Sequence, residues 1–266
     1  MDAAKMNLRI FIFLSVASLC LAQNCKTAAA VAKAPADTNS IEIILQNLNE
    51  QTASLKSYQA RIEYRFSQPL LESQALRTGA MYYLKSDDRS NLRINFQTLR
   101  QDEEKEQKYI EQYIFDGVWL TVIDHQIKQV KKYQLAEANE PADAFELAAN
   151  NFPIIGFNSS QDLKKDFEIS LLERKAAGLD NLTGLLLKVK PDSVYKDNYS
   201  SVEFYIDKKI NLPAKIIAYS TEGDIYEIKL LEPKINQPID EEIFKIKIPQ
   251  GFGAAEIIPV EKTNRK

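Results

Sequence analysis

The chain has 266 residues, with 34 Lys and Arg against 37 Asp and Glu, a formal net charge of −3 and 45% hydrophobic residues. This balance is typical of a globular protein, and the chain lacks the excess positive charge that marks a nucleic-acid-binding protein. The length fits one large all-β domain or two small domains.

Residues 1–22 have the pattern of a secretory signal. Lys5 and Arg9 precede a largely apolar run over residues 10–21, which is too short for a permanent membrane span and is followed by Ala22. We expect cleavage after Ala22. The removed segment carries Asp2, Lys5 and Arg9, a net charge of +1, so the formal charge of −3 becomes −4 in the exported chain.

The two cysteines give no internal disulfide. Cys20 leaves with the signal, and Cys25 stays in residues 23–37, an Ala-, Lys- and Pro-containing stretch without periodicity that we interpret as a flexible leader. A lone cysteine after a signal raises the alternative of a lipid anchor at Cys25. Gln23 and Asn24 precede it where lipid attachment needs small residues, so a soluble exported protein is favoured.

Residues 38–253 are expected to form one domain. From Thr38 to Ser57, apolar residues at helical spacing predict one amphipathic helix, with Thr38, Asn39 or Ser40 as its N-cap. From Tyr58 onward the period changes to two, because Tyr58, Ala60, Ile62, Tyr64 and Phe66 alternate with polar residues, as in a half-buried antiparallel strand.

Further strands are predicted over residues 78–85, 91–99, 109–115 and 118–124. The charge run at residues 100–108 is expected at a solvated hairpin end. Asp116-Gly117 predicts a type I′ hairpin turn just before Trp119, the only tryptophan. The meander continues through residues 126–135, with Ile127 and Val130 as candidate inward residues.

The strand pattern is interrupted at residues 140–157, where Pro141 suits the start of a short helix and Pro153 its end. Five more strands follow, which brings the expected total to ten or eleven strands with two helical insertions. A sheet with so many strands curls. The fold class is therefore mainly β with a helical lid: a single curled antiparallel sheet forming an incomplete barrel, covered by the N-terminal helix and the mid-chain insertion. Residues 254–266 are expected to be a C-terminal tail.

The residues give little support for an enzyme. His125 is the single histidine and is expected to be exposed in a turn, and no Gly-x-Ser-x-Gly elbow accompanies it. One His and one Cys cannot build a zinc site, and no phosphate loop or dinucleotide fingerprint is present. The carboxylates are expected at outward-facing strand positions. We therefore predict no catalytic site, metal or cofactor.

The order of motifs resembles the periplasmic outer-membrane lipoprotein carrier family, whose members are LolA-like. The resemblance spans about Ile41 to Phe252 and is carried by the helix "IILQNLNEQTASLKSY", the strand "YQARIEYRFSQP", the hairpin "IFDGVWLTVIDHQIKQV" and the ending "FKIKIPQGF", which is similar to a Phe-x-Phe-x-x-Pro-x-Gly motif. It implies a periplasmic monomer with an apolar cavity for acyl chains, which shuttles lipoproteins from an inner-membrane releasing transporter to an outer-membrane receptor.

Two groups of site residues follow from this resemblance and from the strand periodicity. The family places a basic residue after the second strand to hold the lid shut, and here Lys85 or Arg89 are the candidates, next to the acidic pair Asp87 and Asp88. The candidates for the cavity or lid are Ile44, Leu48, Ile62, Tyr64, Tyr83, Ile94, Phe96, Phe115, Trp119 and Phe145.

Two alternatives remain open at this point. The same fold occurs in proteins that sense envelope stress or bind a partner without shuttling, and in related lipid-binding forms. A lipid-anchored receptor form would carry acylated Cys25. The partners expected in either case are acylated lipoproteins or lipids, and not nucleic acid.

Overall fold

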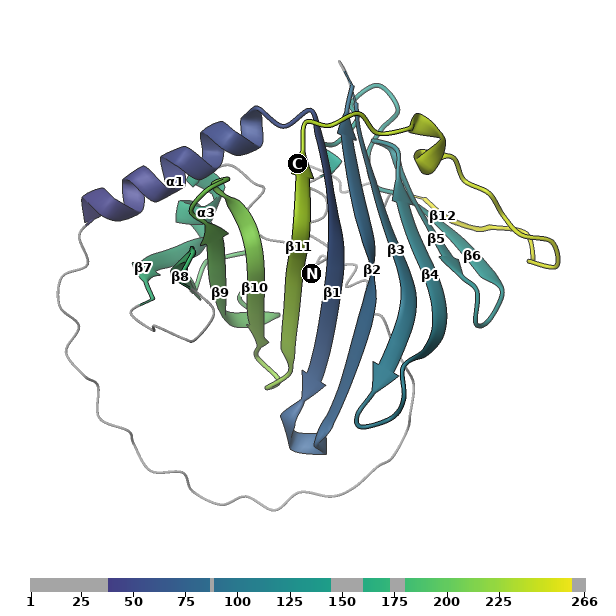
Figure 1. Cartoon of the computed structure of the whole chain (residues 1–266), viewed down its shortest axis with the longest axis horizontal. Helices are drawn as coiled ribbons and strands as arrows, with labels where there is room; N and C mark the ends of the chain where they lie inside the picture. The colour runs from purple at the N-terminus through teal and green to yellow at the C-terminus, as the bar shows by residue number, and fades with distance from the viewer. Residues whose placement is uncertain (1–37, 87–88, 145–159, 173–179, 260–266) are drawn as a thin grey trace.

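The structure, a computed structural model, describes residues 38–86, 89–144, 160–172 and 180–259. Twelve strands dominate this described part (Figure 1). The elements are α1 (Thr38–Ala53), β1 (Ser57–Gln68), η1 (Pro69–Leu71), β2 (Ser73–Lys85), β3 (Ser90–Gln101), β4 (Gln107–Phe115), β5 (Trp119–Asp124), β6 (Gln129–Gln134), α3 (Ser160–Asp166), β7 (Phe167–Leu171), β8 (Leu182–Val189), β9 (Tyr199–Asp207), β10 (Leu212–Ser220), β11 (Ile225–Ile235), η2 (Glu241–Phe244) and β12 (Glu256–Ile258).

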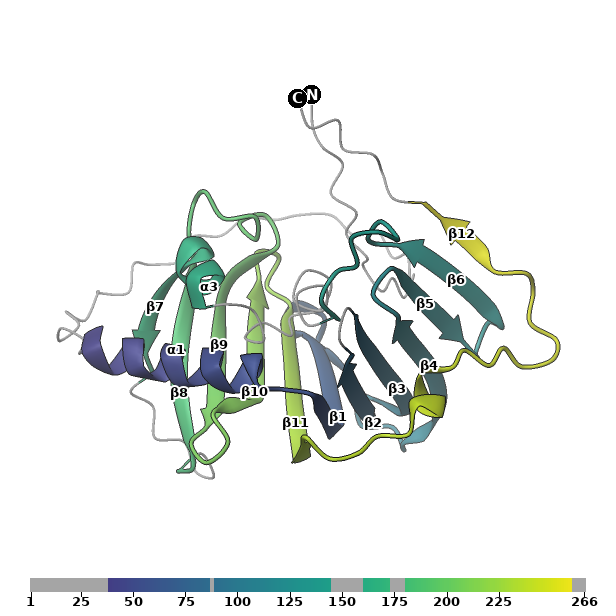
Figure 2. The same ribbon diagram turned by 90° about the horizontal axis from the view of Figure 1, so that it is seen from above.

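All twelve strands belong to one sheet in the order β12-β6-β5-β4-β3-β2-β1-β11-β10-β9-β8-β7. Two antiparallel meanders, β1 to β6 and β7 to β11, are joined side by side where β1 pairs with β11. The sheet curls but does not close into a barrel (Figures 1 and 2). The predicted fold class is confirmed, with one difference: β12 pairs with β6 in parallel. No helix of the described residues is long and apolar enough to cross a membrane.

The seam between β1 and β11 is apolar on one face and charged on the other. On the concave face, Ile62 pairs with Leu230 and Tyr64 with Ile228. On the convex face, Lys229 Nζ lies 3.3 Å from the carboxylate of Glu227 and 3.8 Å from that of Glu63. In this part of the seam, alternation therefore sends side chains of opposite character to opposite faces, whereas the register shifts between Gln59 and Arg61.

The carboxyl of Glu227 is held ionised by this seam. Burial raises the pKa of Glu227, but Lys215 and Lys229 lower it by more, so the pKa lies below its usual range. Lys215 Nζ is 3.4 Å from the same carboxylate. The convex side of the seam thus adds charge pairing to the backbone ladder.

Helix α1 lies on the concave side of the second meander, across β7 to β10 (Figure 2). Leu45 and Leu48 point into the core and are each 1% exposed, whereas Ile43 is 53% exposed. The amphipathic helix is as expected but ends at Ala53. Its link to β1 is clamped by Asn236, whose side-chain oxygen accepts hydrogen bonds from the backbone N–H groups of Lys56 (2.7 Å) and Ser57 (3.2 Å).

Two local predictions were wrong and one helix was missed. The turn after β4 is not type I′, because only Gly117 has a positive φ (95°), and the Asp116 carboxylate instead accepts hydrogen bonds from the N–H groups of Val118 and Trp119. Ile127 does not point inward; it sits in the β5–β6 turn and is 66% exposed. Helix α3 was not predicted. Most of the insertion expected at residues 140–157 lies outside the described residues.

Gly79 is the point where the first meander is most tightly packed. It pairs with Phe96 next to a register shift that leaves Gln97 as an extra residue on β3. A Cβ added to Gly79 would lie 1.9 Å from the backbone oxygen of Asn95. Only glycine permits this approach of two backbones.

Gly79→Ala should therefore destabilise the fold by about 3 kcal/mol, because backbone atoms have to shift to admit the methyl group. The measurement is the free energy of unfolding by urea titration. Gly253→Ala is the matched control, since a Cβ there meets nothing within 4 Å and its φ is not in the left-handed range. Equal stability of the two variants would contradict the close approach.

Candidate functional site

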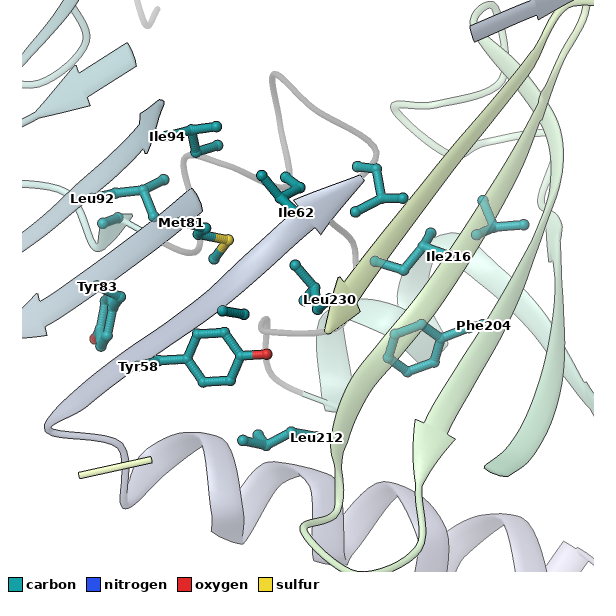
Figure 3. Packing of buried hydrophobic residues seen from close by; sticks show 14 of the residues in the cluster. Tyr58, Ile62, Met81, Tyr83, Leu92, Ile94, Phe204, Leu212, Ile216 and Leu230 are labelled. Carbon is teal, nitrogen blue, oxygen red and sulfur yellow. The ribbon is translucent and has the colours of Figure 1, made fainter. Parts of the chain in front are cut away.

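The concave face of the sheet carries one continuous apolar cluster that includes strands of both meanders and α1. Figure 3 shows side chains from β1, β2, β3, β9, β10 and β11 converging above the helix. The side chains in this view are almost completely buried, so the face is filled and closed in this state. The labelled members are Tyr58, Ile62, Met81, Tyr83, Leu92, Ile94, Phe204, Leu212, Ile216 and Leu230.

Most of the predicted cavity residues lie on this face. Pairing across β1 to β4 places them with the same orientation, since Ile62 is opposite Gly79, Met81 is opposite Ile94, and Ile94 is opposite Tyr113. On α1, Leu48 is buried in the cluster and Ile44 is half-buried against it. The structure thus brings together Ile44, Leu48, Ile62, Tyr64, Tyr83, Ile94, Phe96 and Phe115, and their contact with a ligand stays a prediction.

Trp119 was predicted to line the cavity, but it lies on the opposite face. Leu120 pairs with Phe115 on the concave face, so its neighbour Trp119 points to the convex face. There its ring lies 5.2 Å below the Nζ of Lys132. The turn at Gly117 sets this parity, and Trp119 cannot line a cavity on the concave face. Phe145 lies outside the described residues.

The two gating candidates are exposed at one end of the first meander. Lys85 ends β2, and its backbone N–H donates to the carbonyl of Lys56 in the α1–β1 link (2.8 Å). Arg89 directly precedes β3, where its side-chain stem approaches Gly117. Both are near the lid link by position, and a gating role for either stays a prediction.

Residues 142–144 are anchored over the ends of β2, β3 and β4. The Ser90 hydroxyl donates to the Asp143 carboxylate (3.0 Å) and accepts from the N–H of Ala144 (2.7 Å). The N–H of Ala142 donates to the carbonyl of Gly117 (2.9 Å). Burial and the nearby Asp143 raise the pKa of Tyr83, which keeps its hydroxyl protonated. The segment therefore closes this end of the concave face through polar contacts.

A buried ion pair interrupts the apolar face toward the η1 end. Arg77 Nη1 donates to the Glu111 carboxylate at 3.0 Å, and the two side chains are 5% and 6% exposed. The guanidinium lies 5.0 Å from the ring centre of Tyr109 and 6.0 Å from that of Phe96. The pair is thus enclosed by aromatic rings in a nearly dry environment.

The protonation equilibria at this ion pair reflect that burial. Burial raises the pKa of Glu111 by more than Arg77 lowers it. Burial is also the first cause of the raised pKa of Tyr109, about 12, which Arg77 partly offsets. Tyr109 therefore stays protonated near neutral pH, and Glu111 accepts the hydrogen bond of Arg77.

The expectation that carboxylates point outward was wrong for Glu111, whereas a second buried carboxylate does point outward. Glu203 is on the convex face but is only 8% exposed, because the hydroxyls of Tyr205 (2.7 Å) and Tyr219 (3.0 Å) donate to its carboxylate. Two tyrosine hydroxyls thus satisfy one buried carboxylate. This arrangement stabilises the second meander without contributing to the concave face.

His125 lies in the β5–β6 turn as predicted, but it is half-buried and not exposed. His125 follows β5, but its ring packs against Phe252 at 5.1 Å and its Nε2 is buried. Burial lowers the pKa of His125. Within the described ranges, no group of three or more His, Cys, Asp or Glu side chains is arranged to hold a metal ion.

The sequence predictions missed two sets of residues on the concave face. Arg77 lies outside the strand predicted over residues 78–85, and the carboxylate of Glu111 was expected to point outward. In the structure the two residues share the period of Met81 and Phe115 on their strands. The second set comes from the second meander, whose strands were predicted without assigning faces. It comprises Leu185, Leu187, Val202, Phe204, Ile206, Ile216 and Ala218.

No protein-family model matches the chain, and no curated protein matches its sequence. Among solved structures it is similar to an uncharacterized conserved protein from Thermus thermophilus, at 12% identity over 83% of this chain and 99% of that chain, with a TM-score of 0.47. MucB matches at 12% identity over 79% of this chain and 64% of that chain, with a TM-score of 0.48, so the chain spans less than two thirds of MucB.

A LolA superfamily protein from Nitrosomonas europaea matches at 15% identity over 77% of this chain and 97% of that chain, with a TM-score of 0.33. The curled, unclosed sheet with few helices is the architecture that the sequence predicts. Similarity at this level carries no argument about function, which rests on the site itself.

Removing one member of the buried ion pair should be costly. We expect Arg77→Met to lower the free energy of unfolding by about 3–5 kcal/mol, because Glu111 is left as an unpaired buried charge. The double variant Arg77→Met with Glu111→Leu should recover most of that loss. Urea titration measures both.

The control is the exposed pair of Arg61 and Glu232, whose side chains are 55% and 78% exposed and 3.9 Å apart. Arg61→Met should cost less than about 1 kcal/mol. If Arg77→Met and Arg61→Met had the same small effect, the Arg77–Glu111 pair would not be buried in solution.

Proposed function

We propose that this protein is a periplasmic carrier that binds the acyl chains of lipoproteins on the concave face of its sheet. The main observation in support is that one apolar cluster joins both meanders to the buried face of α1. Because α1 is held on the sheet by apolar contacts, another apolar molecule of similar shape can take its place there. Hydrocarbon chains are occupants of that kind.

The energetic requirement supports this face as the binding surface. Transfer of an acyl chain from water to an apolar site contributes roughly 0.8 kcal/mol per CH₂, so a long chain needs an extended apolar lining. The lining also has to be closed in the empty protein, since a large exposed apolar patch favours association. The near-complete burial of Ile62, Ile94 and Phe204 meets the second requirement in the closed state.

In this proposal two segments act as the lid. Helix α1 covers the second meander and can swing on the link at residues 54–56, and residues 142–144 close the end of the first meander through Ser90. Opening exposes the concave face to cargo from an inner-membrane releasing transporter, and closure after delivery to an outer-membrane receptor restores the buried core. Lys85, whose backbone N–H bonds to Lys56 in the link, and Arg89 are the candidates for a gating role.

The alternative is a protein of the same fold that senses or binds an envelope partner without shuttling. The observation that favours it is the C-terminal segment on the convex face, described below, which is held by few contacts. Depletion separates the two functions: loss of a carrier strands lipoproteins at the inner membrane, whereas loss of a sensor changes only a stress response. A lipid-anchored receptor form predicts acylated Cys25, which mass spectrometry of the mature N-terminus detects.

The direct experiment is lipid extraction and mass spectrometry of the protein purified from its native envelope. Stoichiometric acylated cargo or lipid supports the proposal. Protein that carries none and takes up none when incubated with a fluorescent long-chain fatty acid or a triacylated lipopeptide contradicts it.

A pair of adjacent variants on α1 tests the role of the lid. Ile44 is half-buried against the apolar cluster and Ile43 is 53% exposed on the other side of the same helix. Ile44→Glu should weaken binding of the fluorescent fatty acid about tenfold, because a carboxylate then faces the hydrocarbon. It should also impair release of lipoprotein from inner-membrane vesicles.

Ile43→Glu adds the same charge to the same helix and should bind and release cargo as the unmodified protein does. Circular dichroism and urea titration establish that both variants are folded. Normal cargo release by folded Ile44→Glu would count against α1 as the lid.

A further inference from the structure

The chain continues after β11 as a C-terminal arm, residues 240–258, which crosses the convex face and reaches the far edge of the sheet (Figures 1 and 2). Arg93 Nη1 on β3 donates to the carbonyls of Ile243 and Lys245 near the start of the arm. Beyond Lys245 the arm is mostly exposed, and Ile246 and Ile248 are 37% and 49% exposed. The arm therefore meets the rest of the protein at separate points.

The last of these contact points is a small apolar surface on the convex face, which we call the arm site. It consists of Ile114, Ile123 and Val130 from β4, β5 and β6, with Phe252 and Ala255 of the arm packed on it. The side chains of Ile114, Ile123 and Val130 are 1%, 0% and 1% exposed. The arm site is separate from the concave cluster, because the strands lie between them.

The arm covers its site imperfectly. Thr121 pairs with Ile114 across the strands and shares the convex face, and its Oγ1 is buried without a hydrogen-bond partner in the described part of the chain. The Nε2 of His125, whose ring packs against Phe252, is likewise buried without one. A buried polar atom with no partner lowers the stability of the state that buries it. An occupant that bonded to either atom would bind better than the arm.

The edge of the sheet next to the arm site is also covered only in part. β12 has three residues and pairs in parallel with Lys131 to Tyr133 of the six-residue β6. Its Glu256 lies 3.8 Å from the Nζ of Lys131, and Ile257 is 65% exposed. A strand edge of this kind pairs readily with an added strand.

The charge at this edge selects among such strands. Lys128, Lys131 and Lys132 lie on or beside β6, and the occupant that the structure shows there contributes one acidic residue. Positive charge along an edge favours an acidic segment and disfavours a basic one. Besides acidic charge, a partner segment needs an aromatic side chain upstream of its strand, as Phe252 precedes β12.

We propose that the arm site and the edge of β6 form a binding site for an extended acidic segment of another protein, with an aromatic residue that takes the place of Phe252. The C-terminal arm is the occupant of this site within the same chain and is displaced when the partner binds. The partner strand adds to β6 and its polar groups reach Thr121 or His125. The arm site lies on the opposite face from the concave cluster, although Ile258 of β12 also packs against that cluster. Binding of the partner segment does not require that the concave face carries lipid.

Two changes to the full-length protein set the arm free or lock it. Phe252→Ala removes its main apolar contact and leaves the sheet unchanged. A disulfide between Lys132→Cys and Ile257→Cys, which are directly paired, locks the arm, since adjacent strands lie roughly 5 Å apart, within the range that a disulfide spans. Cys25→Ser is included in the locked protein, and its reduced form is the matched control for both cysteines.

The probes are a synthetic peptide of residues 250–259 and a phage library of ten-residue peptides. The synthetic peptide should bind Phe252→Ala about tenfold more tightly than the unmodified protein, because the competing arm is weakened. A peptide with Ala in place of its Phe should bind at least about tenfold less tightly. The library should yield peptides with an aromatic residue and acidic residues, and these should bind the reduced protein but not the locked one.

Three results would overturn the proposal. The first is equal binding of the selected peptides to locked and reduced protein, and the second is failure of every peptide to bind the reduced protein and Phe252→Ala. The third is dimerisation of the unmodified protein through exchanged arms, seen by light scattering and absent in the locked form, which would make a second copy the occupant. The comparison of peptide binding between the locked and the reduced protein is valid even if Phe252→Ala does not fold.

Discussion

The pairing of β1 with β11 is the constraint on which the rest of the structure depends. It joins two meanders that are each consecutive in the chain, and its register sets which face of every other strand looks inward. Ile62 and Tyr64 meet Leu230 and Ile228 on the concave face, while Glu63 and Glu227 meet lysines on the convex face. A slip of one residue would send the charges into the core, so the alternation fixes one register.

The strands of the sheet were predictable because each carries its own period-two signal. Alternation along β1, β2 and β3 placed Ile62, Tyr83 and Ile94 on one face, and all three lie in the concave cluster. The same signal failed for Trp119, where parity depends on the geometry of a turn that sequence did not specify. It did not indicate the buried ion pair, because Arg77 lies outside the predicted strand and Glu111 was expected to point outward. Their charges compensate each other only because the fold brings residues 34 positions apart into contact.

What sequence could not supply were contacts between distant segments. No local pattern shows that β11 closes against β1, or that the chain after Lys245 crosses the convex face and ends beside β6. Helix α3 is only seven residues long, and it is held by tertiary contacts: Lys164 Nζ bonds to Glu42 on α1 (2.6 Å), and Lys190 bonds to the carbonyl of Lys164 (2.6 Å). Helices this short depend on packing more than on propensity.

The proposed lid and the C-terminal arm are anchored at separate points, although they begin at neighbouring points and Ile258 of the arm also packs against the concave cluster. Asn236 bonds to the α1–β1 link directly after β11, and the arm leaves from there. Arg93 then holds the arm at Ile243 and Lys245, before its exposed stretch. Displacement of residues 246–258 therefore leaves the Arg93 anchor in place, and the clamp on the lid link lies upstream of that anchor. A partner at the edge of β6 and an acyl chain under α1 thus compete with different segments of the chain.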